Sequence, residues 1–552
     1  MAERDAAAIK AFYVARGYLN AQVGYRIDFE KDSETDLVVT FIISEGIQHY
    51  IQSIKFVGNT VFDDARLVSM MRSFVGEVVD ADVLKADREK LLQEYGRLGY
   101  VYAEVNTSHV FAEDDGFVNL TVTVVEQAQY RFGRIVVRGN RNTKDRVIRR
   151  ELRFLPEELY DTTKAKAAEQ SLVETRLFND AKITPVGDQP GVRDALVTLE
   201  EADTTSILFG VGITSNSGLV GSISIEQRNF DIFDTPRSGR EFFRGRSFRG
   251  AGQTMRLVVE PGTELNRARL EFREPYLFDR DIGMGLALYL FERGRDEFDE
   301  RRIGFSPSFD KRFREGPLKG WATEASFRFE QIKIGGTDIF TAQDIRDDRG
   351  NNWLTSVKGT LVRDTTDSRW LPSRGDRLQL SLEQVGALGG DHFFPKAVAT
   401  YDKYFTLKTD VFGRKHILQF GTTVGQIFGD APVFEKFFAG GIGSLRGFAF
   451  RGISPRDGIR DDAVGGDFLV LTNAEYSFPL IGKTVRGATF IDMGTVEKDF
   501  GIQSWRAAAG FGARIYIKYF GPIPLSFDFA VPLAEEDGDD TQFFSFSFGA
   551  SF

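Results

Sequence analysis

Residues 321–330 read WATEASFRFE, and the period of two in this stretch decides the fold. In a strand, successive side chains point to opposite faces. One face therefore carries Trp321, Thr323, Ala325, Phe327 and Phe329, and the other carries Ala322, Glu324, Ser326, Arg328 and Glu330. Inside hydrocarbon every backbone polar group must be paired within the protein, so strands cross a membrane only as a closed barrel with a wet lumen. We therefore predict a membrane-spanning antiparallel β-barrel.

The same alternation begins at Thr205 and recurs toward the end of the chain, for example at residues 207–214 and 378–383. At about 20–22 residues per strand and loop, this part of the chain supplies about 16 strands. The alternative is a large soluble β-sandwich or propeller. A soluble core would not place Arg and Glu at its inward positions, and the inverted arrangement would expose a continuous Phe and Leu surface to water.

The last nine residues continue the pattern, with Phe544, Phe546, Phe548, Ala550 and Phe552 on one face. A terminal Phe that closes an alternating aromatic strand resembles the β-signal of bacterial outer-membrane proteins. We therefore expect the barrel to be complete at its C-terminal end.

Composition excludes several other classes of protein. The net charge is −10 with both signs mixed, which gives no support for a nucleic-acid partner. No window approaches 18 uncharged apolar residues, so we expect no transmembrane helix. The absence of Cys excludes disulfides and thiolate metal sites, and the four His are scattered. We find no metal-ligand spacing, catalytic triad or phosphate-binding loop, and we predict a protein without cofactor or enzymatic activity.

Residues 1–203 contain an internal repeat with a period of roughly 80 residues. The passage at residues 15–23 matches residues 97–105 and, more weakly, residues 176–183, while residues 54–59 match residues 135–140. Each complete unit has the pattern of a strand, a Gly-Asn turn, two helices and two strands, which predicts a small α+β domain. Generic α+β linker domains are the alternative reading.

The first copy lacks its opening strand and first helix, and the N-terminus has no apolar segment of a signal peptide. We therefore expect the chain to begin within a domain, and a longer precursor to carry the signal. The expected division is a partial domain at 1–48, complete domains at 49–128 and 129–203, and the barrel at 204–552.

The stretch from about Phe428 to Gly466 is long for a hairpin loop and is rich in Gly and in charge. Its centre reads GGIGSLRGF, residues 440–448, with the candidate residues Gly440, Gly441, Ser444, Leu445, Arg446, Gly447 and Phe448. Turned into the lumen, Arg446 would need a carboxylate, because an unpaired charge in a confined site is costly. Glu475 and Asp492 lie on the next two expected strands, and the planar guanidinium suits a bidentate carboxylate pair. A solvated loop arginine is the alternative.

Residues 445–448 resemble the (Val/Leu/Ile)-Arg-Gly-(Phe/Tyr) tip of the sixth extracellular loop in BamA-type assembly factors and their two-partner-secretion relatives. Residues 490–496 resemble the strand that follows that loop, and residues 364–375 and 274–277 resemble other barrel segments of the family. The repeats resemble polypeptide-transport-associated (POTRA) domains. The departures are Leu445, where Val is commonest, and the shortened first repeat.

The resemblance implies insertion of β-barrel proteins into the bacterial outer membrane, with the POTRA domains in the periplasm. It implies that Arg446 pairs with Asp492 and Glu475. It also implies three kinds of partner: unfolded outer-membrane clients, accessory periplasmic lipoproteins and outer-membrane lipid. The alternatives are a two-partner-secretion transporter and a translocation-and-assembly-module exporter, whereas a passive porin would not explain the repeats.

We further expect the first and last strands to meet at a weak lateral seam, and the resemblance implies that this seam opens and pairs with an incoming client strand. Glycine weakens a strand interior. The expected seam residues are Phe209, Gly210 and Gly212 on the first strand, and Phe546, Phe548, Gly549 and Phe552 on the last.

Overall fold

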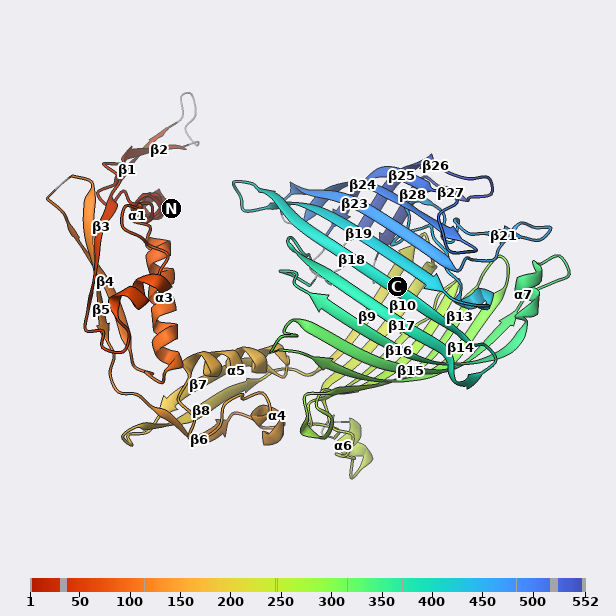
Figure 1. Cartoon of the computed structure of the whole chain (residues 1–552), viewed down its shortest axis with the longest axis horizontal. Coiled ribbons are helices and arrows are strands. Elements are labelled where there is room, and N and C mark those ends of the chain that lie inside the picture. The colour runs from red at the N-terminus through yellow and green to blue at the C-terminus, as the bar shows by residue number, and fades with distance from the viewer. Residues whose placement is uncertain are drawn as a thin grey trace. The chain divides into compact units, whose positions relative to one another are not determined.

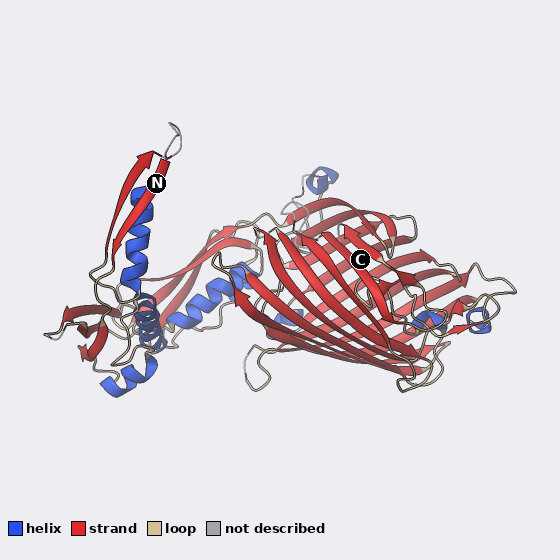
Figure 2. Cartoon of the chain, turned by 90° about the horizontal axis from the view of Figure 1, so that it is seen from above, coloured by secondary structure: helices blue, strands red, loops and turns tan. Residues whose placement is uncertain are grey.

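The computed structural model describes residues 2–29, 37–113, 115–243, 245, 247–314, 316–369, 371–482, 484–516 and 525–548. The chain divides into two compact units, Met1–Ala202 and Asp203–Phe552. The first is a mixture of helices and strands, and the second is made almost wholly of strands (Figures 1 and 2).

Two complete α+β repeats and part of a third make up the first unit. The partial repeat comprises α1 (Ala2–Ala15), β1 (Gln22–Phe29) and β2 (Leu37–Ser44). The next comprises β3 (Tyr50–Val57), α2 (Asp64–Met70), α3 (Ala81–Arg97), β4 (Glu104–Phe111) and β5 (Phe117–Val125). The last comprises β6 (Arg131–Arg138), α4 (Asp145–Arg149), α5 (Thr162–Glu174), β7 (Phe178–Val186) and β8 (Val192–Glu201). In both complete repeats the final strand is central, parallel to the first and antiparallel to the second.

In both complete repeats the long helix begins at an aspartate whose side chain accepts hydrogen bonds from the first free backbone N–H groups. Asp80 caps α3 through Asp82 N and Val83 N, and Asp161 caps α5 through Thr163 N and Lys164 N. The helices then bury one apolar face against the sheet, as Leu91 and Tyr95 do in α3. The α+β pattern expected from the sequence is confirmed.

The same pair of hydrogen bonds joins consecutive repeats twice. A glutamine amide and the next backbone N–H donate to two carbonyl groups that follow the preceding long helix. The bonds are Gln48 Nε2 to Arg16 O (3.0 Å), His49 N to Gly17 O (2.8 Å), Gln129 Nε2 to Leu98 O (2.7 Å) and Tyr130 N to Gly99 O (2.9 Å). The repeats are therefore linked by a recurring joint as well as by covalent chain.

A glutamate closes the turn after the first strand in each complete repeat. Glu126 accepts hydrogen bonds from Thr60 N (2.7 Å), Val61 N (2.9 Å) and the Tyr95 hydroxyl (2.9 Å). Glu201 does the same for Asn142 N (2.9 Å) and Thr143 N (2.7 Å) in the next repeat. Burial raises the pKa of Glu126, but the hydrogen bonds outweigh it and hold the pKa below its usual range.

We predict that Glu126→Gln weakens this turn by about 1–3 kcal/mol, because one neutral oxygen cannot satisfy the donors that the carboxylate accepts. Amide exchange at residues 60–61 should accelerate at neutral pH. Because folding lowers the pKa of Glu126, the stability difference between wild type and E126Q reaches its full size above the ordinary pKa of glutamate. The difference disappears as the pH falls through the lowered pKa of the folded state. Equal exchange in both proteins at neutral pH would contradict the assignment.

The second unit is a closed antiparallel barrel in which sixteen strands are ordered among the described residues. Each strand pairs with its neighbours in sequence, and the last strand returns to the first. The strands are β9 (Thr205–Thr214), β10 (Gly218–Phe230), β11 (Gln253–Glu260), β12 (Leu265–Glu274), β13 (Gly283–Gly294), β14 (Asp299–Arg312), β15 (Trp321–Gly335), β16 (Gly350–Asp364), β17 (Gly375–Gly390), β18 (Phe394–Thr409), β19 (Lys415–Ile427), β23 (Phe468–Ile481), β24 (Val485–Glu497), β25 (Arg506–Ile515), β26 (Leu525–Ala534) and β28 (Phe544–Phe548). The predicted fold class is confirmed.

Short elements lie in the connections between barrel strands. They are α6 (Gly239–Phe243), η1 (Leu277–Asp279), α7 (Gln343–Asp347), η2 (Val433–Glu435), β20 (Gly447–Phe448), β21 (Arg456–Asp457), β22 (Asp462–Ala463) and β27 (Thr541–Gln542). Four of them, η2, β20, β21 and β22, belong to the long connection between β19 and β23. Within the described part of the chain, no helix is long and apolar enough to span a membrane.

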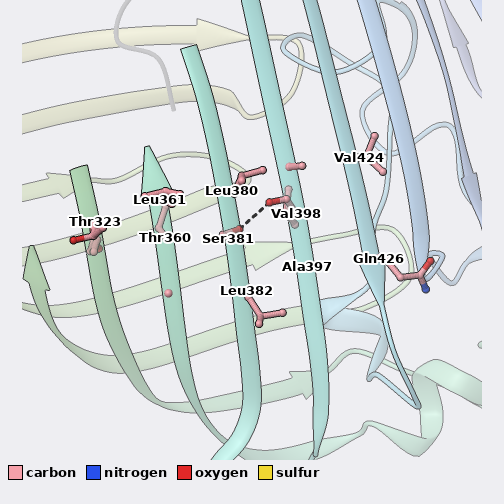
Figure 3. Close-up of a pocket in the computed structure, with 13 residues that line it drawn as sticks. Thr323, Thr360, Leu361, Leu380, Ser381, Leu382, Ala397, Val398, Val424 and Gln426 are labelled. Atoms are coloured by element: carbon pink, nitrogen blue, oxygen red, sulfur yellow. Dashed lines mark hydrogen bonds between the residues drawn. The ribbon is translucent and has the colours of Figure 1, made fainter. Parts of the chain in front are cut away.

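The two faces of the wall differ as the alternation requires. On β15, Arg328 reaches Glu383 of β17 and Glu435 of the long loop on the lumenal side, while Phe329 is exposed on the other side. An apolar groove of about 660 Å³ crosses β15 to β19, and Leu361, Leu380, Leu382 and Val424 are among its lining residues (Figure 3). Most of its side chains have the outward parity of Phe329, so the groove belongs to the lipid-facing wall and lies apart from the charged lumen.

Candidate functional site: an arginine of the long loop inside the barrel

Arg446 is held inside the barrel by two carboxylates. Its Nε and Nη2 donate to the two oxygens of Asp492 at 2.7 and 2.8 Å, and its Nη1 donates to Glu475 at 2.6 Å. The backbone N–H of Arg446 also donates to Asp492, at 3.0 Å. Arg446 is 8% exposed and Asp492 1%, so this bidentate pair is largely withdrawn from solvent.

Adjacent strands bring the two carboxylates together. Glu475 lies on β23 and Asp492 on β24, and the register pairs Glu475 with Phe490. The Phe490 ring lies beneath the guanidinium, whose Cζ is 3.3 Å from the ring centroid. The site therefore combines an ion pair with a cation–π contact.

A second arginine extends the site across the next two strands. Arg514 of β25 donates to Asp528 of β26 at 2.7 Å and to Glu475 at 3.3 Å, while Asp528 lies 3.9 Å from Arg446. The sequence analysis missed Arg514 and Asp528. The available signal was a charged residue at a lumenal position on each of the last strands, but no motif marks which of them meet.

The loop around Arg446 is fixed by buried apolar neighbours. Leu445 and Phe448 are fully buried in a cluster with Ala439, Ile453, Leu469, Val496 and Ala508. Gly447 has a φ of +94°, and a Cβ there would lie 2.8 Å from the Cβ of Ala508, so both backbone and space favour glycine. Ser444 Oγ accepts from Gly440 N at 3.2 Å, which closes the turn before the arginine.

A second charged cluster holds the start of the same loop, with the negative charge on the loop and the positive charges on the wall. Here the loop supplies the carboxylate, Glu435, which is 7% exposed. It accepts from Arg302 of β14 at 3.0 Å and from Arg328 of β15 at 2.9 Å. Lys396 of β18 donates to the Glu435 carbonyl at 2.8 Å. The loop is thus tied to the wall at β14, β15 and β18 as well as at β23 and β24.

The expected seam residues lie on β9 and β28 where the structure describes them. Phe209, Gly210 and Gly212 pair with Ile223, Ser222 and Val220 of β10. Phe548 pairs with Ile213 of β9, and Phe546 exchanges hydrogen bonds with Ser215 through its carbonyl (3.1 Å) and its N–H (3.0 Å). Gly549 and Phe552 lie outside the described residues.

The charged groups around Arg446 and Glu435 are matched with one another rather than arranged for catalysis or metal binding. Across the described ranges, no group of three or more His, Asp or Glu residues is placed to hold a metal ion. What the arrangement can do is hold the long loop in place against the wall.

The chain combines tandem α+β repeats with a closed barrel that follows them in the sequence. A loop arginine is held inside this barrel by lumenal carboxylates. These features define the class of outer-membrane barrels that carry such repeats. The Omp85 superfamily domain matches residues 247–552, and the POTRA model, described as a surface antigen variable number repeat, matches residues 49–127 and 130–202. The chain belongs to the Omp85 superfamily.

Within that superfamily the relatives are of the BamA type. The outer membrane protein assembly factor BamA of Nitratidesulfovibrio vulgaris is 28% identical over 100% of this chain and 68% of its own length. BamA of Neisseria meningitidis is 22% identical over 100% of this chain and 72% of its own length. The crystal structure of Haemophilus ducreyi BamA lacking POTRA domains 1–3 superposes with a TM-score of 0.68 at 21% identity, covering 91% of this chain and all of that one.

These findings confirm the prediction of a BamA-type protein with POTRA repeats, located in the outer membrane. They also confirm that it is not an enzyme, because the family is non-enzymatic. CdiB from Acinetobacter baumannii shares the fold, with a TM-score of 0.52 at 13% identity, covering 92% of this chain and 90% of that one.

We predict that Arg446→Ala destabilises the barrel by about 3–5 kcal/mol, because it leaves Asp492 and Glu475 buried without their main partner. The measurement is the temperature at which the folded barrel loses its fast electrophoretic mobility in detergent. Exchange of the charges in Arg446→Asp with Asp492→Arg should restore part of the loss. Arg460→Ala, an exposed arginine of the same loop, is the control. An unchanged transition temperature in R446A would show that the lumenal pair does not stabilise the barrel.

The Glu435 cluster generates a separate prediction. Glu435→Gln keeps the shape of the side chain but removes the negative charge that Arg302 and Arg328 share. The barrel should lose up to about 3–5 kcal/mol of stability, and the temperature of the same thermal transition should fall. Glu324→Gln, on β15 but exposed, is the matched control. If E435Q and E324Q melt together, Glu435 contributes nothing to holding the loop.

Proposed function

We propose that this protein inserts β-barrel proteins into the outer membrane through a lateral seam between β9 and β28. The assembly function follows from the relatives, which are named outer membrane protein assembly factors. The seam is our addition. It rests on one observation, that the barrel closes between β28 and β9, a strand with Gly210 and Gly212 in its interior.

Among the described residues, β28 and β9 share two paired positions, Ser547 with Thr214 and Phe548 with Ile213. On its other edge, β9 pairs with β10 at ten positions. Gly210 and Gly212 lie in the interior of β9, where glycine weakens a strand because it has no side chain to pack. We therefore expect the edge of β9 that faces β28 to become free where the barrel closes.

An incoming client strand would complete that edge by β-augmentation. The driving force is the client's own transfer into lipid, where unpaired backbone groups each cost several kcal/mol. No nucleotide is required. Arg446 and its carboxylates would keep the long loop seated in the lumen while the wall exchanges strands.

The partners implied by family membership are unfolded outer-membrane clients. We further propose that the repeats at 1–48, 49–128 and 129–203 receive clients and dock accessory periplasmic lipoproteins. The exposed backbone edges of β4 and β7 support this proposal, since both are outer strands of their sheets. Outer-membrane lipid surrounds the apolar wall.

A second candidate is export of a single soluble protein through the lumen. The observation in its favour is that residues 445–448 also resemble the loop tip of two-partner-secretion transporters. The two functions differ in what is lost on depletion from the native bacterium. Loss of many unrelated outer-membrane barrels supports assembly, whereas loss of one secreted protein alone contradicts it.

We predict that a disulfide across the seam, from Thr214→Cys with Ser547→Cys, blocks assembly and that reduction restores it. These residues lie opposite each other, within the Cα separation that a disulfide spans. The chain has no native Cys to interfere. The control is Thr360→Cys with Ser381→Cys, an opposed pair inside the wall between β16 and β17. Full assembly with the seam bond closed would refute the seam.

A further inference from the structure

The tip of the long loop touches the protein on both sides of the seam. We define the loop tip as residues 440–452. On one side it meets Asn216, in the turn that follows β9, and on the other it meets residues 540–542, which precede β28. Neither contact involves Arg446 or its carboxylates. Both lie at the end of the barrel where the described pairing of β9 with β28 is found.

The contact on the β9 side is a side-chain amide that pairs with one residue of the loop. Asn216 Nδ2 donates to Ile442 O at 3.2 Å, and Ile442 N donates to Asn216 Oδ1 at 3.3 Å. The amide thus imitates one rung of a sheet. A Cβ on Gly441 would lie 2.7 Å from Asn216 Oδ1, so glycine there permits the close approach. Arg293 of β13 donates to the Asn216 carbonyl and stacks on Phe450 of the loop tip, 4.1 Å from the ring centroid, which supports the turn from behind.

The contact on the β28 side is made by backbone. Gly447 and Phe448 form β20, which pairs antiparallel with Gln542 and Thr541 of β27. Ala449 N donates to Asp540 O at 2.8 Å and Asp540 N donates to Gly452 O at 3.0 Å, which lengthens this small ladder. Phe544, where β28 begins, follows two residues after Gln542.

We propose that the loop tip latches the seam at this end, with Asn216 as the positioning residue on the β9 side. The proposal rests on the seam of the preceding section and deepens it. The turn after β9 and the segment before β28 cannot separate while both stay bonded to one short stretch of loop. Opening here requires the tip to release one flank, and the Asn216 amide is the smaller of the two contacts. Because Arg446 lies between the two contacts, its seat in the lumen holds the latch in position.

The test measures the seam directly in the full chain. Spin labels are placed at Leu219→Cys on β10 and Val531→Cys on β26, which are exposed positions one strand away from the seam on either side. Their distance distribution is recorded by double electron–electron resonance in lipid nanodiscs. Asn216→Ala should raise the ratio of long to short distances by about tenfold, the scale of two lost hydrogen bonds.

Asn216→Asp and Gly441→Ala provide independent variants of the same contact. The first keeps the shape but loses the donor to Ile442 O, and the second pushes the loop away from Asn216. Both should shift the distribution in the same direction. Asn351→Ala, an exposed asparagine near the start of β16, is the matched control and should leave it unchanged. Heat-modifiable mobility establishes that each barrel is folded before labelling.

Unchanged distances in all three variants, with the barrel folded, would overturn the latch. The seam disulfide of the preceding section separates this failure from failure of the proposed function. If the disulfide blocks assembly while N216A leaves the distances unchanged, the seam stands and the latch is wrong. If N216A shifts the distances while the locked protein still assembles clients, the latch stands and the proposed route is wrong.

Discussion

A backbone that crosses hydrocarbon must pair its N–H and C=O groups within the protein, and the whole second unit depends on this constraint. It forces the strands to close on themselves and gives each strand one face toward lipid and one toward water. It also makes the junction of the first and last strands, β9 and β28, the place where the barrel closes. Thr214 and Ile213 carry the described pairing there. A seam that opens there, as proposed above, needs other parts of the molecule to hold the two edges together when it is closed.

Charged contacts in the lumen hold the long loop to other strands of the wall. Arg446 of the loop meets carboxylates of the wall, and Glu435 of the loop meets arginines of the wall. The two anchors have opposite polarity, so a loop shifted along its length would bring like charges together. Buried ion pairs give uncertain net stability, but their best-attested use is to fix register. Here the register that matters is the position of the loop across the barrel.

Much of the fold could be predicted because it follows from short-range patterns in the sequence. Alternation of the kind seen at residues 321–330 predicted the barrel, and the repeat spacing predicted the α+β units. Arg446 could also be singled out from the sequence, because its glycine-rich surroundings and the acidic residues at 475 and 492 lie on consecutive elements. The contacts between distant segments could not be predicted, because they depend on the register between strands and on the path of the loops. Nothing in the sequence brings Asn216 to Ile442 or Arg514 to Asp528, since these contacts exist only after the barrel has closed.

The loop is held by apolar as well as polar contacts, and the two kinds differ in what their release costs. An apolar plug seated in the lumen would have to expose its surface to water on each release, at about 25 cal/mol per Å². Ion pairs and single amide contacts exchange one polar partner for another when the freed groups reach water, so their release costs less where the site is hydrated. The apolar cluster around Leu445 and Phe448 also includes Leu469, Val496 and Ala508 of the wall, so it packs the tip against β23, β24 and β25 beside the arginine. Movement of the loop would therefore break this apolar packing as well as the polar contacts to the wall and the seam.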